Sequence, residues 1–219
     1  MRPVDKGNAP RTDYKKYQDA EPDLEKRLGP YCSFCEMCID HVPEVEHLEA
    51  KSEGGKELDW ENLLLSCKYC NTRKGVRVKS GDKGMYLWPD KDDTFHAYMY
   101  DEDIPRLNEE YLKSKGAEEK TKAENLFELL RLDNIPITPR DKDRRYTLRN
   151  ETRNYAKESK EGLSKINDCS LRADYLDLTI KLALAKGFFS VWMEVFKDDE
   201  EVKQLLISSF KGTKEEYCR

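Results

Sequence analysis

Two pairs of cysteines have the spacing of metal ligands. Cys32 and Cys35 form one Cys-x-x-Cys pair, and Cys67 and Cys70 form another. Two such pairs that converge on one ion supply four thiolates, and soft sulfur ligands of this kind select Zn²⁺ in a tetrahedral site. We therefore expect these residues to hold a structural zinc rather than to be separate buried thiols. The gap between the pairs is longer than in the usual zinc ribbon, so a folded segment must fill it.

The remaining cysteines are interpreted as bystanders. Cys35 also forms a Cys-x-x-Cys pair with Cys38, so Cys38 could replace one zinc ligand. Cys169 and Cys218 stand alone in the later part of the chain and are expected to be packed or free thiols.

A possible general base lies between the two cysteine pairs. Glu46 and His47 are adjacent, Asn62 precedes a run of leucines, and Asn71 follows Cys70. A histidine with a pKa of about 6.5 can take a proton from water at neutral pH. Glu46 and Asn71 offer only oxygen ligands, which suit a hard ion such as Mg²⁺ or Mn²⁺ that stabilises charge on a phosphate. Together these residue types are suited to phosphodiester hydrolysis.

The segment from Tyr31 to Gly75 resembles the HNH endonuclease motif. The residues that carry the resemblance are Val45-Glu46-His47-Leu48, Gly54-Gly55, Trp60-Glu61-Asn62-Leu63-Leu64-Leu65 and Cys70-Asn71-Thr72-Arg73-Lys74-Gly75. The resemblance implies a ββα-metal fold in which Glu46 and Asn71 bind the catalytic ion, His47 is the general base and Asn62 orients its imidazole. Glu46 stands where Asp is commoner and Asn71 where His is commoner, which leaves the preferred ion open.

A second acid-histidine step precedes the first by six residues. Asp40 and His41 are adjacent like Glu46 and His47. We assign the base to His47, because the glycine pair and Asn62 follow it where the motif has them.

The resemblance extends beyond this motif to the PtuB family. The segments that carry it are Met1–Gly7, Tyr31–Glu36, Gly187–Trp192 and Phe210–Thr213. PtuB proteins are the HNH nuclease components of the bacterial Septu anti-phage system and of related retron-associated modules. The resemblance implies a heteromeric complex with a PtuA-type ATPase and, in retron systems, an association with a reverse transcriptase and its DNA. The implied substrate is nucleic acid, DNA first and RNA second.

A catalytically inert adaptor is the alternative function. A zinc-braced module that only binds nucleic acid or protein would need the four cysteines. It would have no need of Glu46, His47, Asn62 and Asn71 in their observed order. We therefore favour the nuclease.

Basic side chains occur in two runs, although the net charge of −5 is the wrong sign for coating nucleic acid. The first run follows the second cysteine pair and comprises Lys68, Arg73, Lys74, Arg77, Lys79 and Lys83. Lys68, Arg73, Lys74 and Arg77 are its candidates for binding substrate phosphates. The second run comprises Arg140, Lys142, Arg144, Arg145, Arg149 and Arg153. It is equally well interpreted as a solvated helix face.

The expected fold is α+β, with a small zinc-braced ββα-metal module and a mainly α-helical C-terminal region. Residues 1–30 form an arm with a short helix at Asp23–Leu28, and residues 31–84 form the module. Within the module we expect strands at Val45–Leu48 and Leu63–Leu65 and a helix that begins near Lys68.

Residues 85–219 are expected to be mainly helical and to dock a partner. Alternation over Thr94–Tyr100 indicates a short strand or two before the helices begin. Phe188–Phe196 is apolar enough to be core or a docking surface.

The sequence contains neither a membrane-spanning stretch nor a glycine-rich phosphate-binding loop. No stretch approaches the roughly 18 apolar residues of a membrane span, and the first residues are charged. We therefore expect a cytoplasmic protein that does not enter membranes. No glycine-rich loop ending in Lys-Ser or Lys-Thr is present, so ATP should bind a partner and not this chain.

Overall fold

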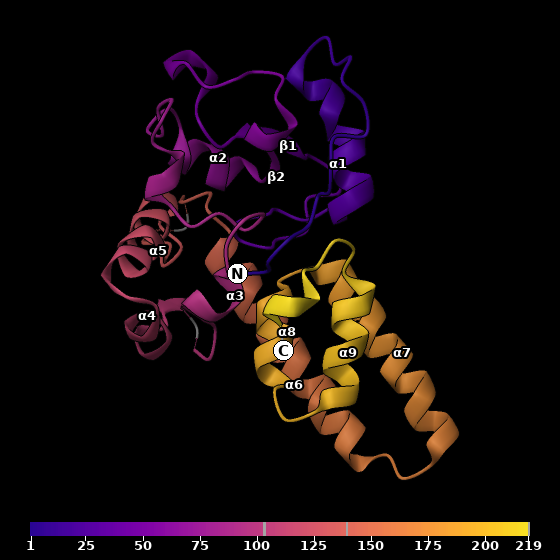
Figure 1. Ribbon diagram of the computed structural model, residues 1–219. Helices are drawn as coiled ribbons and strands as arrows, with labels where there is room; N and C mark the ends of the chain where they lie inside the picture. Colours follow the sequence, from indigo (N-terminus) through magenta and orange to yellow (C-terminus); the bar gives the residue numbers. More distant parts are fainter. Residues whose placement is uncertain (103, 139, 219) are drawn as a thin grey trace.

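Two antiparallel strands and a helix surround the cysteine pairs. The computed structural model describes residues 1–102, 104–138 and 140–218. In it, β1 (Glu44–His47) pairs with β2 (Leu63–Ser66), and α2 (Lys68–Lys74) follows β2 (Figure 1). The register sets His47 opposite Leu63. The ββα arrangement is confirmed, and the predicted strands agree with β1 and β2 to within one residue at each end.

Burial explains the position of these strands. Every residue of β2 is buried, and the side chains of Leu63, Leu64 and Leu65 are fully enclosed. A continuous apolar run of this length is typical of a strand that is covered on both faces. It gives the equally long strand β1, which carries the candidate site residues Glu46 and His47, a fixed partner.

The connection from β1 to β2 is folded back on itself. Gly54 has φ +90°, and the backbone N–H of Gly55 donates to the carbonyl of Ala50 at 3.0 Å. A Cβ atom on Gly55 would lie 2.1 Å from the carbonyl oxygen of Glu49, so only glycine fits there. The glycine pair therefore serves to bring the loop close to the end of β1.

The N-terminal residues pack on the rest of the molecule. α1 (Glu21–Leu28) has Pro22 in its first turn, where proline is tolerated, and buries Leu24 and Leu28. Val4 forms a β-bridge with Thr213 near the other end of the chain. Short 3-10 helices lie at Tyr17–Ala20, Lys51–Glu53, Trp60–Asn62, Lys83–Met85 and Glu215–Tyr217.

A mixed segment links the ββα unit to the C-terminal helices. Its elements are α3 (Thr94–Ala97), β3 (Tyr98–Met99), β4 (Arg106–Leu107), α4 (Glu109–Lys115) and α5 (Ala117–Leu130), with β3 and β4 antiparallel. The strand predicted over Thr94–Tyr100 is therefore only partly correct. Asp93 accepts a hydrogen bond from the backbone N–H of His96 and caps a helical turn there.

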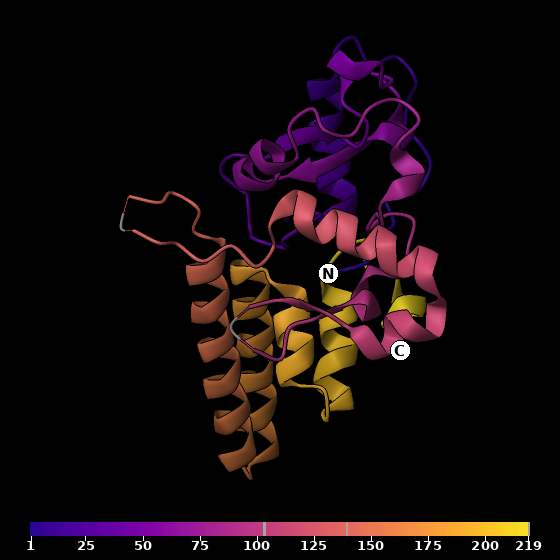
Figure 2. The same ribbon diagram turned by 90° about the vertical axis from the view of Figure 1, so that its left-hand side faces the viewer.

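The C-terminal region is helical, as predicted. It contains α6 (Arg145–Lys165), α7 (Cys169–Lys186), α8 (Phe189–Val195) and α9 (Glu200–Ser209). Figure 2 shows α6 and α7 running side by side as the longest pair, with the loop that precedes α6 projecting from the body of the molecule.

Helix α8 lies between two apolar clusters. Phe188 and Val191 belong to the cluster that contains the ββα unit, whereas Phe189 and Trp192 belong to the cluster formed by α6, α7 and α9. Phe188–Phe196 is therefore core, and its proposed role as a docking surface is wrong because its large apolar side chains are already covered.

Across the described residues, no helix combines the length and the apolar character that crossing a membrane requires.

Candidate zinc centre and active site

The four paired cysteines lie together. The Sγ atoms of Cys32, Cys35, Cys67 and Cys70 are within 4.8 Å of one another, and all four residues are buried. The Sγ atoms of Cys35 and Cys67 are 3.6 Å apart. Zinc–sulfur bonds of about 2.3 Å place the sulfurs of a tetrahedral site about 3.8 Å apart. Both the spacing and the donor chemistry therefore fit zinc.

Each cysteine pair lies in a hydrogen-bonded turn. In the first, the N–H of Cys32 donates to the carbonyl of Met37 at 2.9 Å, and Glu36 has φ +68°. In the second, Cys67 caps α2, and its Sγ accepts from the N–H of Cys70 at 3.4 Å. Burial opposes ionisation of Cys32, but contacts with the other three sulfurs lower its pKa well below the ordinary value. The thiolate is the form that binds metal.

The other cysteines lie outside this group. Cys38 is half-buried, Cys169 is exposed and Cys218 is buried, and all three are free thiols. This agrees with their interpretation as bystanders.

Helix α2 covers one face of β1 with polar side chains. Nζ of Lys74 lies 2.7 Å from Oε1 of Glu46, and the two side chains are 0% and 7% exposed. Burial raises the pKa of Glu46 to about 7, although Lys74 acts in the opposite direction. Glu44, two residues earlier on the same face, accepts a hydrogen bond from Nδ2 of Asn71 at 2.6 Å. The predicted ligands Glu46 and Asn71 thus both lie at the contact between β1 and α2.

His47 is held in one orientation. Its Nε2 atom lies 3.0 Å from the carbonyl oxygen of Glu57. A carbonyl oxygen only accepts, so Nε2 carries the proton and Nδ1 keeps the lone pair. The ring of Tyr17 packs edge-on against the imidazole, with 4.7 Å between centroids. Burial lowers the pKa of His47 below 6.5. The neutral ring, with a basic Nδ1, is therefore the form present at neutral pH.

Asn62 fastens the loop that carries Glu57. Its Oδ1 accepts from the N–H of Glu49 at 2.8 Å, and its Nδ2 donates to the carbonyls of Glu49 and Lys56 at 3.0 and 2.9 Å. The side chain is nearly fully buried. Lys56 is followed by Glu57, whose carbonyl accepts the hydrogen bond from Nε2 of His47. Asn62 can therefore orient the imidazole through the loop backbone.

The donor set for a second ion consists of oxygens. Glu46 offers a carboxylate and Asn71 an amide Oδ1, and Mg²⁺ commonly takes one or two protein oxygens while water and substrate phosphate complete its shell. Within the described part of the chain, the cysteine quartet is the only cluster of three or more His, Cys, Asp and Glu side chains with metal-ligand spacing. A hard ion is compatible with these donors, but it would have to compete with Lys74 for Glu46.

Comparison with known families agrees with this geometry. Residues 35–77 match the family model of the HNH endonucleases. This segment is an HNH endonuclease domain. No curated protein matches the chain, and no solved structure does.

The HNH domain contains Glu46, His47, Asn62 and Asn71. The zinc quartet reaches beyond it, because Cys32 precedes the first matched residue. The cysteine cluster of the domain therefore includes a residue from the segment before it.

The predicted phosphate-binding residues lie in different environments. Lys68 has a 72% exposed side chain and pairs with Glu44 at 3.1 Å. Arg77 is exposed and lines a cavity of about 820 Å³ beside the HNH domain. Arg73 is 31% exposed and its Nη2 lies 3.2 Å from Oδ1 of Asn134. Lys74 is fully buried against Glu46, so its assignment as a phosphate ligand is wrong.

The second basic run is not a uniform solvated face. Arg145, Arg149 and Arg153 are 1%, 2% and 6% exposed, whereas Arg144 is exposed. The alternative of a solvated helix face is wrong for the three buried arginines, and they are equally unavailable as a phosphate-binding patch. Their spacing of one helical turn turns them towards the same side of α6.

Sequence reasoning missed the groups that hold His47. Tyr17 lies upstream of the HNH domain, and Glu57 contributes a backbone carbonyl that any residue could provide. Lys51 is placed by an ion pair with Glu57 at 2.8 Å, and its ammonium lies 4.4 Å from the Tyr17 ring centroid. No spacing rule signals these contacts, because they depend on how the connecting loop folds.

Proposed function

We propose that this protein is a metal-dependent endonuclease that hydrolyses phosphodiester bonds. The observation that carries the proposal is the HNH domain at residues 35–77, in which His47 is buried with its Nε2 proton bound to the Glu57 carbonyl. This leaves a basic nitrogen, Nδ1, on a ring that cannot rotate freely.

His47 is the proposed general base. Nδ1 takes the proton of a water molecule as that water attacks phosphorus, and the Glu57 carbonyl stabilises the imidazolium that results. Tyr17 restricts the ring to this orientation. Glu46 and Asn71 would hold the catalytic ion, Mg²⁺ or Mn²⁺, which supplies a positive charge for the leaving oxygen and the phosphate.

DNA is the proposed substrate, with RNA as the second choice. A centre of this kind acts on phosphate geometry, and the exposed cations around it, Lys68 and Arg77, can position a backbone without reading bases. We therefore expect cutting with little sequence preference. The test is cleavage of single-stranded and double-stranded DNA and of RNA at equal nucleotide concentration.

We further propose that the protein acts in the bacterial cytoplasm as the nuclease subunit of an anti-phage defence complex. The support is the resemblance to PtuB proteins at Met1–Gly7, Tyr31–Glu36, Gly187–Trp192 and Phe210–Thr213. A PtuA-type ATPase is the expected partner, with a retron reverse transcriptase and its DNA in related systems. Co-expression with the ATPase should give one heteromeric species on sizing, and separate elution of the two chains would contradict the assembly.

A zinc-braced adaptor without catalysis is the competing function. The observation that favours it is the buried pair between Lys74 and Glu46, which occupies a proposed ligand of the catalytic ion. The two functions differ in whether His47 is needed for cutting.

Plasmid nicking by the protein, alone and with its ATPase, separates these functions. With Mg²⁺ or Mn²⁺ we expect cutting that His47→Ala lowers by about 10²–10⁴-fold, the usual contribution of a general base. His41→Ala is the matched control, because His41 is 77% exposed and lies beside Asp40. Equal cutting by the native protein and His47→Ala would exclude the mechanism, and no cutting by either preparation would favour the adaptor.

The pH dependence of the same reaction reports on His47. Because burial lowers its pKa, the neutral ring persists below pH 6.5. We expect cleavage to be retained through pH 6.5 and to fall only at lower pH, as Nδ1 becomes protonated. A loss of rate centred above pH 6.5 would contradict the role of this buried histidine.

A further inference from the structure

Helix α6 carries three buried arginines. Arg145, Arg149 and Arg153 are spaced one helical turn apart and are each less than 7% exposed. A buried guanidinium is strongly disfavoured unless hydrogen bonds or opposite charges compensate it. What compensates each of them therefore indicates what this side of α6 is built to contact.

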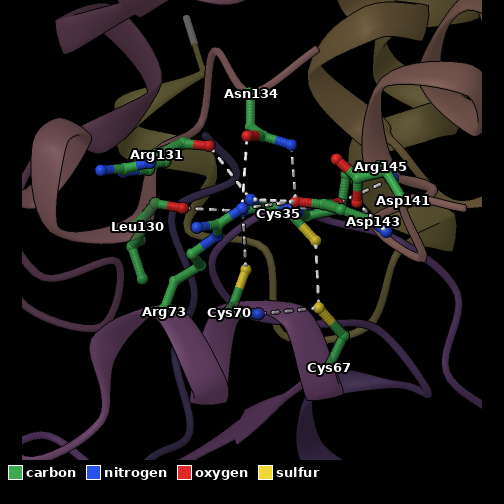
Figure 3. A network of polar contacts seen from close by, with 10 residues as sticks. All are labelled: Cys35, Cys67, Cys70, Arg73, Leu130, Arg131, Asn134, Asp141, Asp143 and Arg145. Atoms are coloured by element: carbon green, nitrogen blue, oxygen red, sulfur yellow. Dashed lines mark hydrogen bonds and ion pairs between the residues drawn. The ribbon is translucent and has the colours of Figure 1, made fainter. Parts of the chain in front are cut away.

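Arg145 reaches the zinc quartet. Its Nη1 lies 3.5 Å from Sγ of Cys70 (Figure 3). Nη1 also donates to the carbonyl of Leu130, and Nη2 donates to the carbonyl of Arg131, at 3.0 Å each. Asp143 binds the same guanidinium through two hydrogen bonds of 2.9 and 2.8 Å. Burial opposes the charge, but Cys70 and Asp143 raise the pKa of Arg145 above its ordinary value.

Arg149 is less completely compensated. Its Nε atom is buried without a hydrogen-bond partner among the described residues, and its guanidinium lies 5.9 Å from the ring centroid of Phe188. Burial lowers its pKa, while the nearby Tyr100 and Cys35 act in the opposite direction. Arg149 is thus a buried positive charge with an unpartnered Nε, one helical turn after Arg145.

Asp143 already pairs with Arg145, whereas four neutral thiols would give Arg149 no counter-charge and Arg145 no further one. Four thiolates around Zn²⁺ carry a net charge of −2, from four negative charges and two positive ones. We propose that Arg145 and Arg149 are the counter-ions of a tetrathiolate zinc centre, so that zinc binding and the packing of α6 against the HNH domain stabilise each other. Arg145 contacts the centre through Cys70, and Arg149 lies buried one helical turn further along α6.

The coupling has to act in both directions. If the arginines raise the affinity for zinc, then zinc must stabilise the buried state of the arginines by the same factor. The zinc centre would then fix the C-terminal helices to the HNH domain as well as bracing the domain itself. This inference is independent of the proposed nuclease activity, because it concerns the thiolates and α6 alone.

Charge-removing and charge-keeping variants of the full chain test the proposal. Arg149→Met and Arg145→Met remove a charge at similar length, whereas Arg149→Lys and Arg145→Lys keep it. Arg144→Met is the matched control, because Arg144 is exposed and immediately precedes α6 as its N-cap residue. The readout is zinc transfer to a chromophoric chelator. We expect the Met variants to bind zinc about 10–100-fold more weakly, as groups that support metal ligands do, and the Lys variants and Arg144→Met to change it much less.

Cobalt substitution gives a readout that packing alone would not move. The sulfur-to-cobalt charge-transfer band should shift in Arg145→Met, because the Cys70 sulfur loses its donor, and should stay in place in Arg144→Met. Unchanged zinc affinity in a folded Arg149→Met protein would overturn the proposal. Equal losses in the Lys and Met variants would also overturn it, since they would show that shape and not charge matters.

The native protein provides a test that does not depend on whether the variants fold. Removing zinc with a chelator should increase hydrogen exchange over residues 145–153 as well as around the cysteines, and adding zinc should reverse it. Protection in α6 that is the same with and without zinc would show that the helix does not depend on the centre.

Discussion

The ion pair between Lys74 and Glu46 decides the charge beside His47. Both side chains are buried, and the two atoms are 2.7 Å apart. Removing one partner from such a pair leaves a buried charge without compensation, which costs about 3–5 kcal/mol. A divalent ion bound to Glu46 would supply the same compensation. Lys74 and the proposed catalytic ion would therefore be alternatives at this carboxylate.

This competition predicts the behaviour of Lys74→Met. The variant should be less stable than the native protein without divalent ions, by about 3–5 kcal/mol, because Glu46 stays buried. Mg²⁺ should then raise its melting temperature more than that of the native protein, since ligand binding to the folded state stabilises it. Differential scanning fluorimetry across a Mg²⁺ titration at pH 8 measures both effects.

Lys68→Met is the control for this experiment. Lys68 lies on the same helix and pairs with Glu44, but its side chain is 72% exposed, so its loss should change stability little. An equal Mg²⁺ response in native protein and Lys74→Met would show that the ion does not bind at Glu46.

Residue types and spacings predicted that the four cysteines cluster, because each pair is a local feature, closed within one turn of chain. Cys32 and Cys35 need only their own turn, and Cys67 and Cys70 only the start of α2. The environment of Lys74 could not be predicted in this way. A lysine in a basic run is ordinarily solvated, and its burial depends on Glu46 from a strand earlier in the chain.

At the scale of elements, the loop between β1 and β2 positions the base. β2 follows from its apolar run, so it could be predicted, and β1 pairs with it. The path of the loop could not, because it is set by hydrogen bonds from Asn62 to the backbone of Glu49 and Lys56. Almost any residue can provide a backbone N–H or C=O group, so the residue types of the loop do not indicate these hydrogen bonds.

Asn62→Ala should therefore loosen the loop and displace Glu57. The variant loses three hydrogen bonds and leaves backbone groups of the loop unsatisfied, for which we expect a loss of about 1–3 kcal/mol in unfolding free energy. Cleavage should fall mainly in kcat, because His47 loses its fixed orientation while the exposed cations proposed to bind phosphate remain. Chemical denaturation and steady-state cleavage kinetics measure the two effects.

Asn125→Ala provides the comparison. Asn125 donates a single hydrogen bond, to the carbonyl of Met85 at 2.9 Å, and lies outside the HNH domain. It should leave kcat unchanged. A kcat for Asn62→Ala as high as that of Asn125→Ala would mean that the loop does not control the base.

At the scale of the molecule, the turn that carries Cys32 and Cys35, here called the zinc turn, is joined to the N-terminal residues and to the C-terminal region. The carboxylate of Glu36 accepts hydrogen bonds from the backbone N–H of Arg2 and from the N–H and hydroxyl of Ser190, each at 2.7 Å. Its carbonyl accepts from the N–H of Phe188 at 2.8 Å. These contacts join residues far apart in sequence, so no periodicity or motif could predict them.

Gly187 tests how much this junction contributes. It ends α7 with φ +73°, and a Cβ there would lie 2.5 Å from the carbonyl oxygen of Glu36. Gly116 ends α4 with φ +100° and has nothing within 4 Å of such a Cβ. Both glycines combine a positive φ with an extended ψ, a region almost confined to glycine, so alanine at either position costs about 1–3 kcal/mol. Only Gly187→Ala also pushes the zinc turn away from α8.

We expect Gly187→Ala to be less stable than Gly116→Ala by about 1–3 kcal/mol, the usual effect of overpacking. Thermal and denaturant unfolding of the two variants measure this difference directly. Gly187→Ala should also release zinc faster, because Glu36 lies between Cys35 and the junction, whereas Gly116→Ala should release it at the native rate. Equal stability and equal zinc release in the two variants would mean that the ends of the chain can separate from the zinc turn without disturbing it.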